Sequence, residues 1–269
     1  RTLVNVVRNP ATSIGQVVVN LIVAVIVGCI YWRLDNTDEP NRAVRDRTGC
    51  LFFIMVNLMF SNASAIEIFL QERVQFVHER TSGYYSTSAY FVSKLFCDMV
   101  PVRVIPTIIF ATACYFMTGL QKDVDKYFHF IAICVLQSMV SASLCFYMSS
   151  CFSVFAVANL SVTMVYVMSM IFSGLLVSVN EWPSGSRWLG YLSFCKYSYE
   201  LAVENEFEGL TFNCADHEGA CDGTEVLGPE YLNIDTGEMG IKYLAMCCFV
   251  VGFLALGYMQ LERITSYRG

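Results

Sequence analysis

Polar side chains interrupt the long apolar stretches of this sequence, and these are the residues that could do chemistry. Three of them and one aromatic ring are separated by steps of three and four residues, so a helix would present them on one face. They are Asn57, Phe60, Ser64 and Glu67. An amide and a carboxylate flanked by an aromatic ring can either bind a ligand or join two helices, and both readings stay open. Arg103 is a candidate ion-pair partner for Glu67.

Catalytic and metal-binding motifs are absent from the sequence. It contains no G-x-x-x-x-G-K-[ST] phosphate loop, no H-E-x-x-H, no G-x-S-x-G and no C-x-x-C pair. The histidines, His78, His129 and His217, are too scattered to suggest a metal site. We therefore expect neither a catalytic site nor a metal site in this chain, and the lack of a TVGYG-like filter argues against a channel.

The composition indicates that the chain is a membrane protein. Of the 269 residues, 55% are hydrophobic and only 15% are charged, and the net charge is -6. Soluble domains carry about a quarter charged residues, so this chain cannot cover a water-facing surface. The apolar content excludes a disordered chain, and the acidic balance disfavours a nucleic-acid binder.

Charge-free runs predict six transmembrane helices. A spanning helix needs about 20 residues to cross about 30 Å of hydrocarbon. The longest run, from Tyr127 to Asn180, has 54 residues with His129 as its only titratable group, so it must hold two helices with a turn near 149–153. The predicted spans are 14–32, 49–70, 95–120, 127–149, 154–178 and 243–261. The predicted fold is an all-α polytopic membrane domain with both termini on one side.

The orientation is predicted from cysteines, because the positive charges divide almost evenly between the two sides. Cys214 and Cys221 lie in the acidic loop 205–240, which has no lysine or arginine. Two loop cysteines fit a disulfide in an oxidising compartment, which would place this loop outside and both termini in the cytoplasm. Two free thiols in a cytosolic loop are the alternative. The aromatic stretch that precedes this loop predicts short helices at the outer membrane interface.

Several strings in the sequence resemble one protein family. They are LVNVVRNP, GCLFF, FVHERTSGYY, SAYFVSKL, CYFMTGL, MIFSGLLV and NEFEGL. Their order and spacing are similar to those in the transmembrane domain of G-subfamily (White-type) ABC half-transporters, most of all the multidrug exporters, over nearly all 269 residues. The resemblance implies one ABC-2 type domain, 1–269, with an elbow helix in 1–13, a coupling helix in the inner loop 71–94, and outer re-entrant helices and the acidic loop in 179–242.

The resemblance also implies a function for the intact protein. An ATP-binding domain, absent from this sequence, would bind ATP and Mg²⁺ and make the intact protein a transporter ATPase. Two copies would dimerise around a cavity and export amphipathic, often planar, organic molecules or xenobiotics across the plasma membrane by alternating access. The implied partners are the second half-transporter, the ATP-binding domain, membrane lipid or sterol, and small-molecule substrates.

The family's functional positions carry over residue by residue. The resemblance implies substrate-binding residues Phe53, Asn57, Phe60, Thr163, Tyr166, Val167 and Met170; gate residues Leu175 and Leu176; a polar network of Glu67 and Arg103; coupling residues Glu79, Gly83 and Tyr84; and a disulfide between Cys214 and Cys221.

Some positions depart from the family's multidrug exporters, so alternatives remain. Val56 and Tyr166 stand where those exporters have threonine and phenylalanine, and the outer loop has two cysteines rather than three. An intrachain bridge is favoured, but pairing between subunits is open. One alternative function is a sterol, lipid or pigment-precursor transporter that works as a heterodimer. Another is a non-transporting scaffold or receptor, in which the polar stripe only joins helices.

Overall fold

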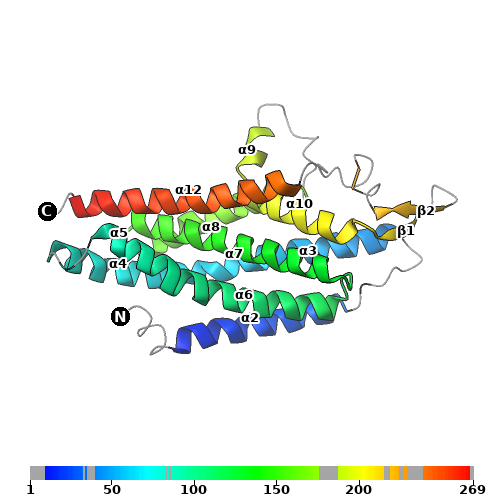
Figure 1. Ribbon diagram of the computed structural model, residues 1–269, viewed down its shortest axis with the longest axis horizontal. Coiled ribbons are helices and arrows are strands. Elements are labelled where there is room, and N and C mark those ends of the chain that lie inside the picture. The colour runs from blue at the N-terminus through cyan, green and yellow to red at the C-terminus, as the bar shows by residue number, and fades with distance from the viewer. Residues whose placement is uncertain are drawn as a thin grey trace.

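The computed structural model describes residues 10–32, 34, 40–82, 84, 86–175, 187–214, 219–223, 227–228 and 239–266. The helices lie side by side in one elongated bundle (Figure 1). They are α2 (Pro10–Ile30), α3 (Pro40–Ser61), the 3-10 turn η1 (Asn62–Ser64), α4 (Ala65–Thr81), α5 (Thr87–Lys94), the π-helical turn η2 (Leu95–Met99), α6 (Val100–Thr118), α7 (Val124–Cys151), α8 (Phe155–Ile171), α9 (Arg187–Tyr191), α10 (Phe194–Phe207) and α12 (Met239–Ser266). Strands β1 (Thr211–Cys214) and β2 (Gly219–Asp222) form an antiparallel hairpin.

The apolar helices coincide with the predicted spans. Among the described residues, four are long and apolar enough to cross a membrane, namely Ala43–Arg80, Pro101–Thr118, Val124–Cys151 and Met239–Ile264. Two shorter apolar helices, Gly15–Ile30 and Phe155–Ile171, occupy the other predicted segments. The chain is thus an all-helical membrane domain apart from its small hairpin. As predicted, α7 and α8 are separated by a tight turn, and α2 begins at the end of the bundle where α12 stops (Figure 1).

The helix that contains the second predicted span, 49–70, extends beyond it at both ends. It runs from Ala43 to Arg80, which is 38 residues and at 1.5 Å per residue gives roughly 57 Å, far more than the hydrocarbon thickness. The charged residues beyond Ile66 do not end this helix, because the helix can continue past the membrane into water. The prediction also missed the 3-10 turn inside the run and the β1–β2 hairpin.

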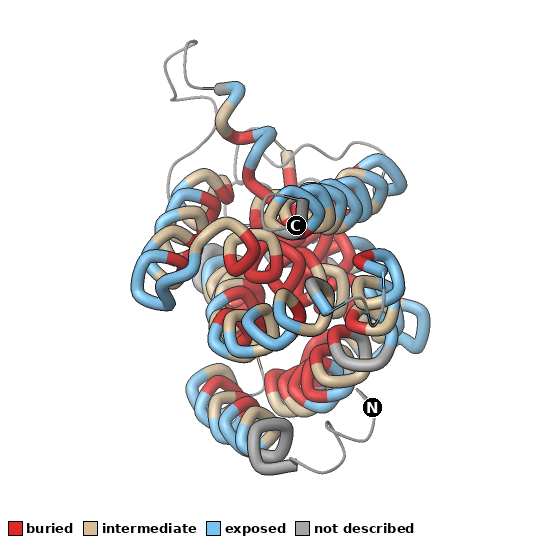
Figure 2. Tube along the Cα trace, turned by 90° about the vertical axis from the view of Figure 1, so that its left-hand side faces the viewer, coloured by how far each residue is buried: buried red, intermediate tan, exposed pale blue. Residues whose placement is uncertain are grey.

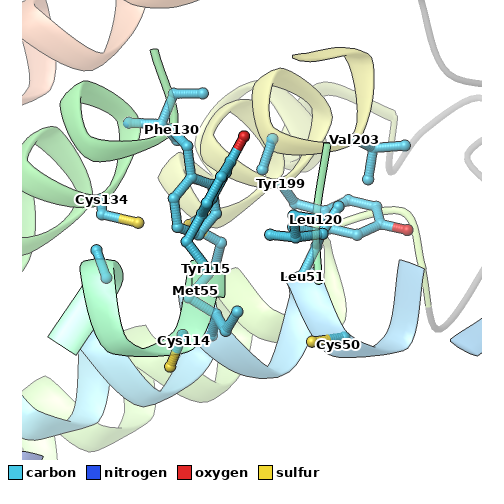
Figure 3. Packing of buried hydrophobic residues seen from close by; sticks show 14 of the residues in the cluster. Cys50, Leu51, Met55, Cys114, Tyr115, Leu120, Phe130, Cys134, Tyr199 and Val203 are labelled. Atoms are coloured by element: carbon cyan, nitrogen blue, oxygen red, sulfur yellow. The ribbon is translucent and has the colours of Figure 1, made fainter. Parts of the chain in front are cut away.

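Helix α7 is the centre of the bundle. It contacts α3, α4, α6, α8, α10 and α12. A view along the bundle shows buried residues facing the centre and exposed ones on the perimeter (Figure 2). One apolar cluster joins α3, α6, α7 and α10 through residues such as Met55, Tyr115, Phe130 and Tyr199 (Figure 3). A second cluster, around Tyr166, joins α4, α7, α8 and α12.

Helix α10 is short, yet it lies inside the protein. The Ser193 hydroxyl caps its first turn by accepting a hydrogen bond from the Lys196 amide at 3.2 Å. The residues from Ser198 to Phe207 are all buried, and the helix contacts α3, α7, α8 and α12. Because α10 is too short to span a membrane, its carboxylates have to be paired within the protein.

Candidate substrate site

The predicted substrate residues of α3 lie on an open face of this helix. Phe53 and Phe60 keep 47% and 37% of their surface exposed. Asn57 lies between them, one helical turn from each. Its Nδ2 is enclosed and has no hydrogen-bond partner among the described residues. Because this amide has no bond to hold it inward, the half-buried side chain could turn outward and donate a hydrogen bond to a ligand that stacks on the two rings.

Helix α8 supplies the ring that supports Phe60. The ring of Tyr166 meets that of Phe60 edge to face, with centroids 5.6 Å apart and an interplanar angle of 79°. Tyr166 is completely buried, and its hydroxyl donates to the Ser141 carbonyl at 3.0 Å and lies 3.1 Å from the Cys145 Sγ. Tyr166 therefore lies behind Phe60, not at a surface that a ligand could reach.

The remaining predicted residues of α8 are half-buried. Thr163, Val167 and Met170 lie along the same helix as Tyr166. The gate residue Leu175 follows the end of α8, where Gly174 adopts a φ of 96°, and it packs against the α3–α6–α7–α10 cluster. Leu176, the second predicted gate residue, lies outside the described residues.

The two residues of the predicted polar network have different partners. Glu67 is exposed, and its Oε1 accepts from the Gln71 Nε2 one turn along α4 at 3.3 Å. Arg103 is buried, and its Nη1 lies 3.5 Å from the Ser64 Oγ, which it can donate to. Among the described residues Glu67 and Arg103 form no ion pair with each other, so the structure does not support the pairing considered from the sequence.

The predicted coupling segment, 71–94, is tied to the bundle by charged side chains of α4. Glu72 forms an ion pair with the buried Lys94 at the end of α5. Arg73 donates to the carbonyls of Ser149 and Phe152, at 2.9 and 2.6 Å, and so joins α4 to the α7–α8 turn. Of the predicted coupling residues, Tyr84 is 79% exposed, Glu79 is half-buried near the end of α4, and Gly83 lies outside the described residues.

A cavity of about 700 Å³ opens at this same end of the bundle. It is lined by Leu70, Arg73, Val74, Val77 and His78 of α4, Ser153 of the α7–α8 turn and Ile264 of α12. None of these is a predicted substrate residue. The cavity adjoins the coupling segment, whereas Phe53, Asn57 and Phe60 lie on an open face of α3 in the single chain.

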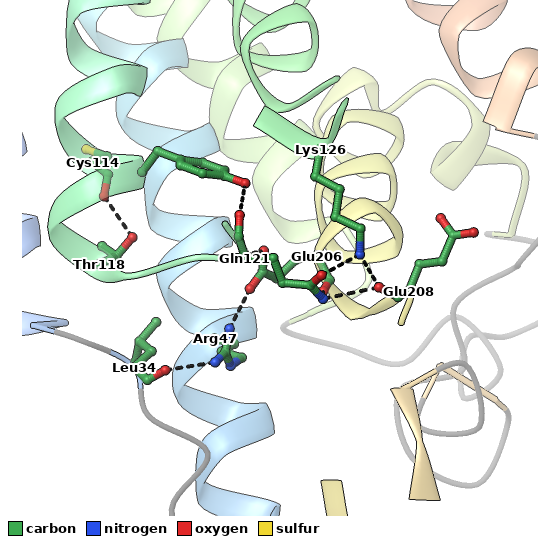
Figure 4. Close-up of polar contacts among 9 residues, drawn as sticks. Leu34, Arg47, Cys114, Thr118, Gln121, Lys126, Glu206 and Glu208 are labelled. Atoms are coloured by element: carbon green, nitrogen blue, oxygen red, sulfur yellow. Dashed lines mark hydrogen bonds and ion pairs between the residues drawn. The ribbon is translucent and has the colours of Figure 1, made fainter. Parts of the chain in front are cut away.

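Charged residues at the opposite end form a cluster that the sequence analysis missed. Arg47 at the start of α3 forms a buried ion pair with Glu206 of α10, and Gln121 donates to the Glu206 carbonyl at 2.6 Å (Figure 4). Burial raises the pKa of Glu206 to about 7, although the neighbouring Arg47 lowers it. One signal was present in the sequence, since Arg47 is the last charge before the uncharged stretch of α3.

A second charged cluster joins α10 to α12. The Lys242 Nζ lies 2.9 Å from an oxygen of Glu204 and 3.7 Å from an oxygen of Glu200. Lys196 reaches Glu200 from one turn away at 3.7 Å. The described residues contain no group of three or more side chains arranged to hold a metal ion. These charges therefore fix α10 in place.

The predicted disulfide falls on a hairpin whose side chains lie outside the described residues. The backbone register pairs Cys214 with Gly219 and Phe212 with Cys221, so the two cysteines are diagonal neighbours, not directly opposite. Diagonal positions in an antiparallel pair are about 7–8 Å apart, beyond the usual Cα separation of a disulfide. The described residues contain no disulfide, and the nine cysteines whose side chains are described are free thiols.

Comparison with known proteins identifies the family. The sequence model of the ABC-2 type transporter family matches residues 1–207. The chain belongs to this family. It is 32% identical over 277 aligned residues to the broad substrate specificity ATP-binding cassette transporter ABCG2 of Mus musculus, which covers 99% of this chain and 42% of that protein.

Other G-subfamily proteins match along almost the whole chain as well. ABC transporter G family member 24 of Dictyostelium discoideum is 31% identical, covering all of this chain and 23% of that protein. ATP-binding cassette sub-family G member 3 of Mus musculus is 28% identical, covering 96% and 41%. The chain is thus the ABC-2 transmembrane domain of a G-subfamily transporter, and it spans less than half the length of these relatives.

Proposed function

We propose that this chain is the transmembrane half of an ATP-driven exporter of amphipathic, often planar, organic molecules or xenobiotics. The observation that carries the proposal is the face of α3 on which the Phe60 ring, supported edge-on by Tyr166, lies one turn from the unpaired amide of Asn57. A ring held in this way favours flat apolar ligands by stacking, and one amide orients them without strict selection. The name of the ABCG2 relatives, broad substrate specificity ATP-binding cassette transporter, agrees with such a site.

A second copy would complete the site. Phe53 and Phe60 are exposed in one chain, and a homodimer that brought two such faces together would enclose a ligand between four rings. Thr163, Val167 and Met170 would line the cavity from α8. Leu175 and Leu176 would close it on the outer side until the exporter opens.

ATP would drive export through the coupling segment. In this proposal an ATP-binding domain, with ATP and Mg²⁺, moves the α4–α5 segment that contains Glu79, Gly83 and Tyr84. The Glu72–Lys94 ion pair and the bonds from Arg73 to the α7–α8 turn would carry this motion into the bundle. Six spanning helices with cytoplasmic termini in the plasma membrane fit the arrangement. Export then requires only that closure weakens binding on the inner side.

The test is ATP-dependent uptake of a panel of planar drugs and sterols into inside-out vesicles that contain the intact transporter. We expect saturable uptake of flat substrates that Phe60→Ala abolishes at unchanged surface expression. Phe116→Ala is the matched control, because Phe116 is 69% exposed on α6, away from the site. Transport of flat substrates that survives Phe60→Ala would refute the site. Uptake that needs a co-expressed partner subunit would favour the heterodimeric sterol, lipid or pigment-precursor transporter.

A further inference from the structure

The long helix of the candidate site is interrupted just after Phe60. The 3-10 turn η1 (Asn62–Ser64) lies inside the otherwise continuous run from Ala43 to Arg80. A 3-10 turn within a long helix has poorer hydrogen-bond geometry than the α-helix around it and often marks a hinge. The interruption separates α3, which contains the candidate substrate residues, from α4, which leads to the coupling segment.

The side chain of Asn62 hydrogen-bonds back to the helix at the start of the interruption. Its Nδ2 donates to the Leu58 carbonyl at 2.8 Å, the carbonyl that the Asn62 backbone would use in a regular α-helix. A side chain that bonds to the carbonyl four residues earlier competes with the helix and tends to bend it. Asn62 is only 4% exposed, so water cannot replace this bond.

Polar side chains from three other helices surround the interruption. From α2, Asn20 accepts from the Ser61 hydroxyl at 2.9 Å, and Gln16 donates to the Ser64 hydroxyl at 2.7 Å. From α6, Arg103 lies within reach of the same Ser64 hydroxyl. These contacts hold both edges of η1 in a part of the chain where an unsatisfied polar group is costly.

Helix α7 contacts the middle of the interruption. The Asn62 Nδ2 donates to the Ser138 Oγ at 3.0 Å, and the Cys145 thiol donates to the Asn62 carbonyl at 3.5 Å. Cys145 also contacts the Tyr166 hydroxyl at 3.1 Å. One set of α7 contacts thus fixes both the turn that follows Phe60 and the tyrosine on which the Phe60 ring rests.

We propose that Asn62 and Ser138 are positioning residues that hold the Phe60 ring in its stacking orientation and thereby set the preference for flat substrates. The inference rests on the proposed function. Because Asn62 is two residues from Phe60, losing its bond to Ser138 lets the helix rotate at η1 and moves the ring relative to Tyr166. Selectivity should then change while transport of non-planar substrates continues.

The test compares Ser138→Ala with Ser143→Ala in the intact transporter. Ser143 is a matched control, since it is also fully buried on α7 but donates only to the Val140 carbonyl of its own helix. We expect Ser138→Ala to raise the KM for a flat substrate by about fivefold, the factor that one ordinary hydrogen bond represents. The KM for a non-planar substrate of the same uptake panel, and kcat for both, should stay unchanged. Ser138→Thr keeps the hydroxyl and should restore the wild-type KM ratio.

A second measurement does not depend on transport. Hydrogen exchange of residues 58–66 in nanodiscs should be faster in Ser138→Ala than in the wild type and unchanged in Ser143→Ala. The inference is overturned if the two variants exchange alike, or if Ser138→Ala weakens all substrates equally. Wild-type selectivity in Ser138→Ala, together with loss of transport in Phe60→Ala, would refute the positioning role alone. Full activity in Phe60→Ala would refute the proposed function as well.

Discussion

Replacing Gly257 with alanine should destabilise the bundle, whereas the same change at Gly252 in the same helix should not. Gly257 of α12 faces α7, and a Cβ added there would lie 2.7 and 2.8 Å from Cδ1 and Cε1 of Phe146. Contacts this short force one of the two helices or the ring to move. A Cβ added at Gly252 would meet no atom within 4 Å. Comparing the two variants therefore separates the effect of packing on stability from the effect of helix propensity.

The size of the effect depends on whether Phe146 can turn aside. Its ring meets Phe69 edge to face, with centroids 5.4 Å apart, and Phe91 at a tilt, with centroids 5.9 Å apart, so little free space is available. Overpacking of this kind costs about 1–3 kcal/mol, while alanine in place of glycine favours a helix by about 0.5–1 kcal/mol. We expect a net loss of about 1–2 kcal/mol for Gly257→Ala and a small gain for Gly252→Ala.

The chain contains its own probe for this measurement. Five described cysteines, Cys50, Cys114, Cys134, Cys145 and Cys195, are fully buried, so a thiol-reactive fluorophore reports their exposure when the bundle unfolds. For a domain of this size, 1 kcal/mol shifts Tm by about 2–4 °C, so Gly257→Ala should lower it by roughly 2–8 °C. All variants must be heated at one scan rate, because membrane domains seldom unfold reversibly.

The outcome that refutes the reasoning is an equal shift in the two variants. Gly257 would then make no closer approach to α7 than Gly252 does, and the packing of α12 on α7 would be looser than the structure has it. A large loss in Gly252→Ala would point instead to a contact with the second copy or another subunit, because that position is open in the single chain.

Two further predictions concern the charges of α10. Lys242→Met leaves Glu204 buried without its base, which should cost about 3–5 kcal/mol, whereas the exposed Lys122→Met should leave Tm unchanged; equal melting of the two variants would contradict the pairing. Burial raises the pKa of Glu206 from 4.5 to about 7, so the folded state holds this proton more tightly than the unfolded state does. The stability that the protonated carboxyl contributes is therefore full below about pH 4.5 and is lost as the pH rises through 7. Glu206→Gln should therefore flatten the decline of Tm over this range, and an unchanged slope would show that the carboxyl titrates normally.

The sequence located the apolar helices well because the cost of charge in hydrocarbon is large and local, and four of them are long enough to span a membrane. The 54-residue run without lysine, arginine or carboxylate was divided at 149–153, and α7 does end at Cys151. The same rule does not give the ends of the helix that contains the second span. A charge excludes a segment from the hydrocarbon, but it does not end a helix that continues into water, as α4 does to Thr81.

The face of the candidate site could be predicted, but not what lies behind it. Spacing alone places Phe53, Asn57 and Phe60 on one side of α3. The burial of Tyr166 depends on a backbone carbonyl and a thiol of α7, and no periodicity within α8 indicates them. For the same reason Arg103 could be matched to Glu67 by charge, although in the fold its Nη1 lies within reach of the Ser64 hydroxyl.

The position of α10 shows why hydropathy cannot locate a short buried helix. By composition its carboxylates resemble the acidic loop that follows, and exposure to water is the simplest expectation for them. In the fold, Glu206 meets Arg47 of α3, and Glu204 meets Lys242 of α12. Each base comes from a distant part of the sequence, so only the tertiary structure brings the opposite charges together. Because a buried carboxylate that loses its partner is strongly destabilising, these pairs leave α10 few other positions. Any motion that opens the bundle at this end must therefore carry α3 and α12 along with α10 or break at least one of the two pairs.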